Sequence, residues 1–300
     1  MTQTDGGLLV NGVPVVGITS PIQAGQSFYT FLADMPEVVG LPVARGVAAI
    51  VSRTAPGKAT SNEDAAAVVS LSNGLGVLIV ADGLGGHASG ETAAQLAVEH
   101  VELALREADE DADQPLDATQ LRTAILNGFE SANRAVLELG TGAATTLCVA
   151  ELQPDKIRTY HVGDSGIYLI GQRGKLKLQT IAHSPIGYAL ESGLIDETDA
   201  IHHEHRHMIS NVLGSEEMRI EIGPALSMAA RDTLLLATDG LLDNLLIDEI
   251  VQRVRKGPLV DAVQRLVDDA WRRMRTQLSE ASPSKPDDLT IVAFRRIASC

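Results

Sequence analysis

The chain has 300 residues, of which 45% are hydrophobic, and a formal net charge of −15 at pH 7. This length and composition support a substantial hydrophobic core, and the negative charge argues against nucleic acid and anionic membranes as partners because both would repel it. Two cysteines, Cys148 and Cys300, form no disulfide framework, and no apolar run approaches the roughly 18 residues of a membrane span. We therefore expect a soluble, cytoplasmic monomer.

Regular elements follow from the spacing of apolar residues. Strands are predicted from β-branched apolar runs at 47–51, 64–71, 75–82, 157–162, 233–238 and 289–294. Helices are predicted where apolar residues recur at steps of three and four, at 89–107, 121–139, 247–255 and 260–274. Asp117 is the expected N-cap of the second helix. Two helices followed by short strands over 145–179 exclude a regular βαβ alternation, so the predicted fold class is α+β.

Residues 1–42 form a separate N-terminal extension in this prediction. They contain short apolar pieces between Gly, Pro and Gln residues, which fit either a flexible leader or a small hairpin added to the core. No Pro/Gly/Ser-rich linker divides the remaining chain. Residues 43–300 are therefore predicted to form one domain.

The run from Leu75 to Asp82 is the most informative stretch. A strand buried on both faces is predicted to end at Asp82, and glycines follow at positions 83, 85 and 86. Glycines let the backbone turn tightly and approach whatever the carboxylate holds. Mg²⁺ and Mn²⁺ take carboxylate and backbone carbonyl oxygens, so Asp82 and the Gly83 carbonyl are a candidate half-site. A plain strand-to-helix turn explains a single Asp-Gly pair equally well.

Further acids stand at the ends of other predicted strands. Asp164 and Asp239 each follow an apolar run, Asp287 precedes the last one, and Glu63-Asp64 opens the strand at 64–71. For Glu63-Asp64 alone, an ordinary loop-to-strand junction is the simpler explanation. Carboxylates gathered at one edge of a sheet assembly would repel one another unless cations lay between them. The repeated pattern therefore predicts a metal site.

Five motifs stand in order along the chain: Asn62-Glu-Asp64, Asp82-Gly-Leu-Gly-Gly-His87, Val162-Gly-Asp-Ser165, Thr238-Asp-Gly-Leu241 and Asp287-Asp-Leu-Thr290. Together they resemble the signature of the metal-dependent protein serine/threonine phosphatases of type 2C, the PPM family, in its bacterial form. The resemblance covers residues 43 to 296. It includes a segment at about 184–214 that is similar to the family's flap.

The resemblance implies a four-layer α-β-β-α sandwich of two antiparallel β-sheets flanked by antiparallel helices. It implies catalytic roles for Asp82, Asp239 and Asp287, with Asp82 bridging two Mn²⁺ or Mg²⁺ ions and Asp164 holding a third, weaker ion. The implied metal ligands are Asp64, Asp82, Gly83 through its carbonyl, Asp164, Asp239 and Asp287. Glu63 and His87 are implied to act one layer further out, behind the ligands or through water.

The implied activity is hydrolysis of phosphoserine and phosphothreonine in proteins by a metal-activated water. The implied partners are phosphoproteins, such as a Ser/Thr kinase or its targets. Two alternatives stay open: a small phosphomonoester as substrate, and a non-catalytic regulatory module of the same fold. Retention of every motif carboxylate argues against the second.

Two positions depart from the family pattern, one where the substrate phosphate is bound and one beside Asp287. Ala59 stands where many members carry an Arg that holds the substrate phosphate, and Lys58 beside it is the candidate replacement. A Lys supplies a point charge, whereas only Arg supplies a bidentate fork. Asp288 stands where the family usually has Asn, which adds negative charge beside Asp287.

A histidine-rich stretch raises a separate question. His202, His203, His205 and His207 would suit zinc by residue type. Adjacent histidines point in different directions, however, and no cysteine or acid completes a standard zinc spacing. A solvated flap near the active site is the preferred interpretation.

Overall fold

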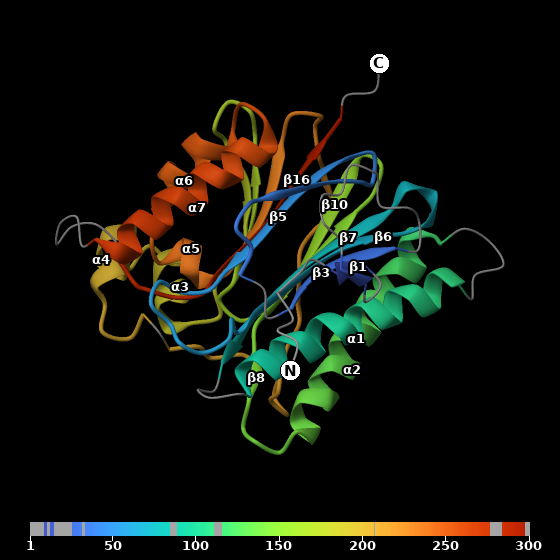
Figure 1. Ribbon diagram of the computed structural model, residues 1–300, viewed down its shortest axis with the longest axis horizontal. Helices are drawn as coiled ribbons and strands as arrows, with labels where there is room; N and C mark the ends of the chain where they lie inside the picture. The colour runs from blue at the N-terminus through green and yellow to red at the C-terminus, as the bar shows by residue number, and fades with distance from the viewer. Residues whose placement is uncertain are drawn as a thin grey trace.

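The computed structural model describes residues 9–10, 13–14, 26–31, 34–84, 89–110, 116–206, 208–276 and 284–297. Two antiparallel sheets pack face to face in it, and helices cover both outer faces (Figure 1). The α+β class and the four-layer sandwich expected from the sequence are both confirmed.

The first sheet contains the strands that carry the first three motifs. Its order is β13 (Glu221–Ile222), β10 (Lys156–Val162), β9 (Leu147–Leu152), β7 (Gly76–Leu84), β6 (Asp64–Ser70), β3 (Ser27–Phe31), β1 (Leu9–Val10) and β2 (Val13–Pro14), with β14 (Leu226–Ser227) beside β10 and β8 (Ala144–Thr145) beside β7. The second sheet has the order β12 (Leu176–Gln179), β11 (Gly166–Ile170), β15 (Thr233–Ala237), β16 (Leu289–Arg296), β5 (Gly46–Arg53) and β4 (Val39–Val43).

Helices close the sandwich on both sides. The long pair α1 (Gly90–Glu110) and α2 (Ala118–Glu138) covers the first sheet, and α6 (Ile247–Val254) and α7 (Leu259–Arg275) cover the second. Shorter helices are α3 (Pro185–Glu191), α4 (Glu197–His202) and α5 (Asp239–Leu242). Within the described ranges, no helix has the length and apolarity needed to cross a membrane.

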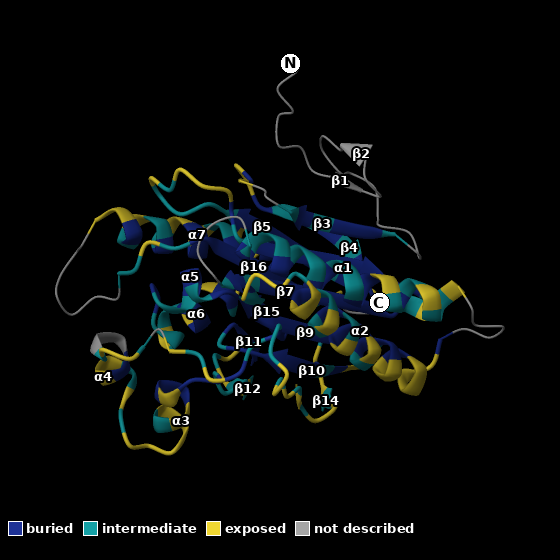
Figure 2. Ribbon diagram, turned by 90° about the horizontal axis from the view of Figure 1, so that it is seen from below, coloured by how far each residue is buried: buried dark blue, intermediate teal, exposed yellow. Residues whose placement is uncertain are grey.

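Three apolar layers hold these elements together. One lies between α1, α2 and the first sheet and contains Ile79 and Phe129, and a second lies between the sheets and contains Leu78 and Phe294. The third lies between the second sheet and α7 and includes Leu266. The central strands are therefore buried on both faces, while the helices expose their outer faces (Figure 2). Burial on both faces explains why these strands are continuous apolar runs rather than alternating ones.

Part of the N-terminal extension belongs to the sheets. β3 pairs with β6 and carries β1 and β2 on its other side, and β4 pairs with β5, so both sheets gain strands from residues before position 44. The Ser27 hydroxyl in β3 donates to the buried carboxylate of Glu102 at 2.9 Å, and Arg106 pairs with the same carboxylate. These contacts fix β3 to α1. The division of the chain at residue 42 stays a prediction, because most of residues 1–25 lies outside the described ranges.

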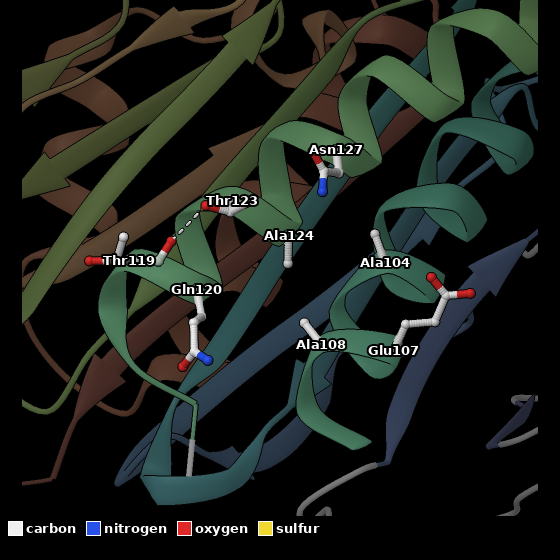
Figure 3. Close-up of a pocket in the computed structure, with 8 residues that line it drawn as sticks. All are labelled: Ala104, Glu107, Ala108, Thr119, Gln120, Thr123, Ala124 and Asn127. Carbon is white, nitrogen blue, oxygen red and sulfur yellow. Dashed lines mark hydrogen bonds between the residues drawn. The ribbon is translucent and has the colours of Figure 1, made fainter. Parts of the chain in front are cut away.

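A shallow hollow lies between α1 and α2, away from the motif residues. Ala104, Ala108 and Ala124 line a cavity of about 440 Å³ there (Figure 3). The hydroxyl of Thr123 is used within α2, where it donates to the Thr119 carbonyl at 3.0 Å. Among the described residues that line it, Glu107 is the one acid. These described residues form no cluster of metal-binding side chains, in contrast to the edge of the sheets.

Asp117 caps α2 as the sequence predicted. Its carboxylate accepts hydrogen bonds from the backbone N–H groups of Thr119 at 2.7 Å and Gln120 at 2.8 Å, and the Gln120 side chain accepts from the Asp117 N–H at 2.9 Å.

We expect Asp117→Ala to lower the free energy of unfolding by about 1 kcal/mol, because both helix N–H groups lose their acceptor. Urea unfolding followed by circular dichroism measures this. Glu130→Ala, at an exposed position of the same helix, is the control and should change the free energy by less than about 0.5 kcal/mol.

Candidate metal centre

The motif carboxylates of the first sheet face one another across two neighbouring strands. Asp64 opens β6 and lies directly opposite Asp82 in the register of β6 and β7. The prediction that the strand ends at Asp82 is wrong by two residues, because Gly83 and Leu84 continue it by pairing with Thr145 and Ala144 of β8. Pairing with β8 holds Asp82 on a fixed strand rather than in a loop.

The remaining carboxylates reach the same edge from other elements. Asp164 lies in the turn that joins β10 of the first sheet to β11 of the second, and Asp239 is the first residue of α5, after β15. Asp287 precedes β16, the antiparallel neighbour of β15, so the end of one strand meets the start of the other. The charges of Asp239, Asp64, Asp164 and Asp287 all act on Asp82. The structure thus brings together the five acids predicted from the sequence.

A buried polar chain ties the two sheets together beneath this cluster. The Thr238 hydroxyl donates to Asp64 Oδ2 at 2.9 Å and accepts from the Thr290 N–H at 3.0 Å. The Thr290 hydroxyl in turn lies 2.7 Å from that of Ser52 in β5, which accepts from the Asn62 side chain at 2.8 Å. Asp64 therefore links the sheets as well as facing the other acids.

Burial and mutual repulsion disfavour the charged forms of these acids. Burial raises the pKa of Asp82 well above its usual value, and the charges of Asp239 and Asp64 raise it further. Burial also raises the pKa of Asp164 to about 7, with the charge of Asp239 as the next cause. The pKa of Asp287 is raised for the same two reasons. Positive charge placed among these groups would favour their ionised forms.

The donor set fits a hard divalent cation. Within the described part of the chain, Asp239 Oδ1 is buried and has no hydrogen-bond partner, which leaves a carboxylate oxygen to be satisfied. Gly83 allows close approach of the backbone, since a Cβ there would lie 2.2 Å from the Gly90 carbonyl oxygen. Side-chain and carbonyl oxygens are the ligands that Mg²⁺ and Mn²⁺ prefer. The predicted ligands Asp64, Asp82, Gly83, Asp164, Asp239 and Asp287 would hold such ions here.

One cation of the chain itself lies inside the acid cluster. Lys285 Nζ is 2.5 Å from Asp239 Oδ2, 3.1 Å from Asp287 Oδ2 and 3.1 Å from Asp243 Oδ2. Burial alone would lower the pKa of Lys285, but the three carboxylates outweigh it and raise that pKa above its usual value. Lys285 and Asp243 were not predicted from the sequence. The available signals were the spacing of Asp243, one helical turn after Asp239, and a lysine two residues before Asp287.

Lys58, the predicted phosphate-binding cation, is paired with acids. Its Nζ lies 2.6 Å from Asp288 Oδ2 and 2.7 Å from Glu63 Oε2. The buried Asp288 carboxylate also accepts from the N–H groups of Ala55 at 2.8 Å and Glu63 at 2.7 Å. Burial would lower the pKa of Lys58, but the hydrogen bonds to Asp288 and Glu63 outweigh it and raise that pKa. Lys58, next to the departure at Ala59, therefore forms an ion pair with the other departure, Asp288. His87 lies outside the described residues.

A cavity of about 410 Å³ opens beside the acid cluster. Its walls come from the predicted flap, which contains α3 and α4, and from α5, α6 and β11. Asp164, Asp239 and Asp243 line its acidic end. Apolar lining residues include Tyr168, Ile181, Ile186, Leu190, Leu242, Leu246 and Ile250.

A second cluster of ligand-type side chains lies behind the flap. In the described ranges, only His161, His183 and Glu221 bring one ligand atom each within 4.8 Å of one another. His183 Nδ1 accepts from the N–H of Gly163 at 3.0 Å and faces the amide of Asn211 at 2.9 Å, so its hydrogen is on Nε2 and points to Glu221. His161 Nε2 donates to the Ile181 carbonyl at 3.0 Å. These bonds occupy both rings and anchor the flap to β10, which excludes a zinc site built on His183 Nε2.

The histidine-rich stretch shows no zinc geometry in the part that is described. His203 Nδ1 accepts from the His205 N–H at 3.1 Å, and the two rings are tilted with centroids 5.6 Å apart. The His202 side chain and all of His207 lie outside the described residues.

The raised carboxyl pKa values predict how the metal-free protein responds to pH. Because the pKa of Asp164 is about 7 in the folded protein against a usual 3.8, the folded protein binds more protons than the unfolded chain between these pH values. Its stability should therefore decrease as the pH rises through this interval. We expect the melting temperature in EDTA to fall between about pH 5 and pH 7.5, and to fall less in Asp164→Asn. An unchanged slope in this variant would contradict the assignment, and Asp261→Asn, at an exposed position of α7, is the control.

Comparison with known proteins agrees with this geometry. Residues 54–281 match the family model described as protein phosphatase 2C. The chain is 30% identical over 187 residues to the serine/threonine phosphatase stp of Listeria welshimeri, an alignment that covers 60% of this chain and 72% of the relative.

Solved structures share the fold over most of their length. The serine/threonine phosphatase PstP/Ppp of Mycobacterium tuberculosis is 28% identical with a TM-score of 0.64, covering 84% of this chain and 98% of that one. The catalytic domain of PstP in complex with two manganese ions is 27% identical with a TM-score of 0.63, over the same shares of both chains. From the family match over residues 54–281, the chain belongs to the protein phosphatase 2C family.

Proposed function

We propose that this protein hydrolyses phosphoserine and phosphothreonine in proteins at a binuclear Mn²⁺ or Mg²⁺ centre. The observation that carries the proposal is the convergence of five carboxyl groups from five elements, with Asp239 Oδ1 buried and unpaired among the described residues. When bound, such ions lower the pKa of a water and neutralise the charge of a phosphoryl group. The similar PstP catalytic domain, which is in complex with two manganese ions, supports a centre of two ions.

The chain's own residues would hold the ions in position and would form no covalent bond with the substrate. Asp82 lies on β7 opposite Asp64, where it would be shared by both ions. Asp239 and Asp287 meet at the adjoining ends of β15 and β16 and would hold the second ion. Asp164, in the turn between the sheets, would hold a third ion more weakly. Because these groups lie on paired strands or directly next to them, they need little rearrangement to bind.

The substrate is proposed to be a polypeptide. The cavity beside the centre offers about 410 Å³ with an apolar wall next to the acids, more than a bare phosphoryl group would fill. It would receive residues next to the phosphorylated side chain, which favours phosphoproteins over small phosphomonoesters. We include cytoplasmic Ser/Thr kinases and their targets among the proposed substrates.

Phosphate release from a phosphothreonine peptide tests the function. We expect turnover with Mn²⁺, none in excess EDTA, and a loss of at least about 100-fold in Asp239→Asn, because a weakly held hard cation loses a charged ligand. Asp261→Asn should keep full activity. Assays with p-nitrophenyl phosphate separate the alternatives, since faster turnover of this ester than of any phosphopeptide would indicate a small-molecule substrate. No turnover of either compound with Mn²⁺ would leave the non-catalytic module.

Two substitutions test how the phosphate is held. Lys58 is already paired with Asp288 and Glu63, so we expect Lys58→Met to leave KM within about twofold and to lower the melting temperature by about 2–4 °C. Ala59 is exposed, and Ala59→Arg should lower KM by roughly tenfold, because it adds a charge-assisted hydrogen bond. Steady-state kinetics on the phosphopeptide measure both. A tenfold rise in KM for Lys58→Met with an unchanged melting temperature would instead make Lys58 the phosphate-binding residue.

A further inference from the structure

The position of Lys285 in the acid cluster is built into the fold. Its backbone N–H donates to Asn244 Oδ1 at 2.9 Å, and its carbonyl accepts from Asn244 Nδ2 at 2.7 Å. Asn244 is fully buried and also donates to the Gly240 carbonyl at 2.9 Å. The backbone that carries Lys285 is therefore clamped to the turn after Asp239. The side chain is only 24% exposed and extends into the cluster from this fixed point.

Lys285 lies next to the proposed position of the second ion. Its Nζ contacts Asp239 Oδ2 and Asp287 Oδ2, one oxygen on each of the two acids proposed for that ion, and leaves Asp239 Oδ1 unpaired. An ammonium group and a divalent cation repel each other when they share the same carboxylates. A metal ion that binds the other oxygens of these two acids would therefore lie close to Nζ and favour its movement away from them.

Asp243 is the acid with which the Lys285 ammonium group can remain paired after that movement. Its Oδ2 lies 3.1 Å from Nζ, and Asp243 is not among the proposed metal ligands. It is the C-cap of α5, where its N–H donates to the Asp239 carbonyl at 2.7 Å. The carboxylate is therefore held near Nζ by the same turn.

We propose that Lys285 is an internal counter-ion that neutralises Asp239, Asp243 and Asp287 before metal binds and gives up Asp239 and Asp287 to the second ion while keeping Asp243. This inference rests on the metal centre proposed above. The affinity for the second ion then depends on how much more strongly Asp239 and Asp287 bind that ion than they bind the ammonium group of Lys285. Lys285 thus stabilises the metal-free fold and weakens metal binding.

Calorimetric titration of Mn²⁺ into the metal-free full-length chain tests the competition. We expect Lys285→Met to bind the second Mn²⁺ about tenfold more tightly, because a charge-assisted contact no longer has to be broken, and to melt at a lower temperature in EDTA. Lys285→Arg keeps the charge and should show no gain in affinity. Lys177→Met is the matched control: it removes an ammonium 2.5 Å from Asp232, away from every proposed ligand, and should leave Mn²⁺ affinity unchanged.

Amine labelling of the unmodified protein provides a test that does not depend on a variant. Acylation followed by peptide mass spectrometry should show faster labelling of Lys285 when Mn²⁺ is added, with no change at Lys177. Equal Mn²⁺ affinity in the unmodified protein and in Lys285→Met, together with unchanged labelling of Lys285, would overturn this inference and leave the metal centre intact. Absence of Mn²⁺ binding in both proteins would overturn the metal centre itself, and the inference with it.

Discussion

Repulsion among buried carboxylates is the constraint on which the rest of this structure depends. The packing of two sheets brings acids from both of them to one edge, where burial raises the pKa of each and the neighbouring charges raise it further. Apolar layers above, between and below the sheets supply the stability that permits such a cluster. A fold that concentrates like charge in this way favours cation binding, because the cation removes a cost that the protein already carries.

Two ion pairs reduce the repulsion among these buried carboxylates. Lys58 neutralises the extra acid, Asp288, and Lys285 neutralises Asp239 and Asp287, which are proposed metal ligands. The pair of Lys58 and Asp288 also explains why this chain can carry Asp288, a departure from the family pattern. An aspartate in place of the usual asparagine is tolerated next to Asp287 because a lysine some 230 residues earlier in the chain reaches it.

Much of the fold could be predicted because buried strands leave a simple pattern. β7 and β15 are apolar on both faces, so length and β-branched content identify them without knowledge of their partners. The cap of α2 was equally predictable, since Asp117 and Gln120 act within one turn. β4 forms a hairpin with β5, but Ala44 and Arg45 occupy its turn at positive φ in place of the usual turn residues, so no turn signal marks it. β3 was not predictable, because what defines it is pairing with β6, further along the chain. The same holds for the extension of β7 past Asp82, which depends on β8.

In the site, too, the residues with a local sequence signal could be predicted and those defined by distant contacts could not. Acids next to apolar runs are visible in the sequence, and five of them meet as expected. Lys285 and Asp243 were missed because nothing local marks a lysine whose partners come from another segment. Contacts formed only by tertiary convergence carry no periodic signal, so a charged residue close in sequence to a motif acid is the only local indication of them.

The place of β16 in the second sheet has a consequence for synthesis on the ribosome. This strand lies between β5 and β15, although β5 is made near the start of the chain and β16 is the last strand described. Until residues 287–296 have emerged, β5 and β15 each present an unpaired edge, and Asp287 is missing from the acid cluster. The nascent protein therefore passes through a long interval in which half of the sandwich is open and prone to association, and its acid cluster is complete only when that interval ends.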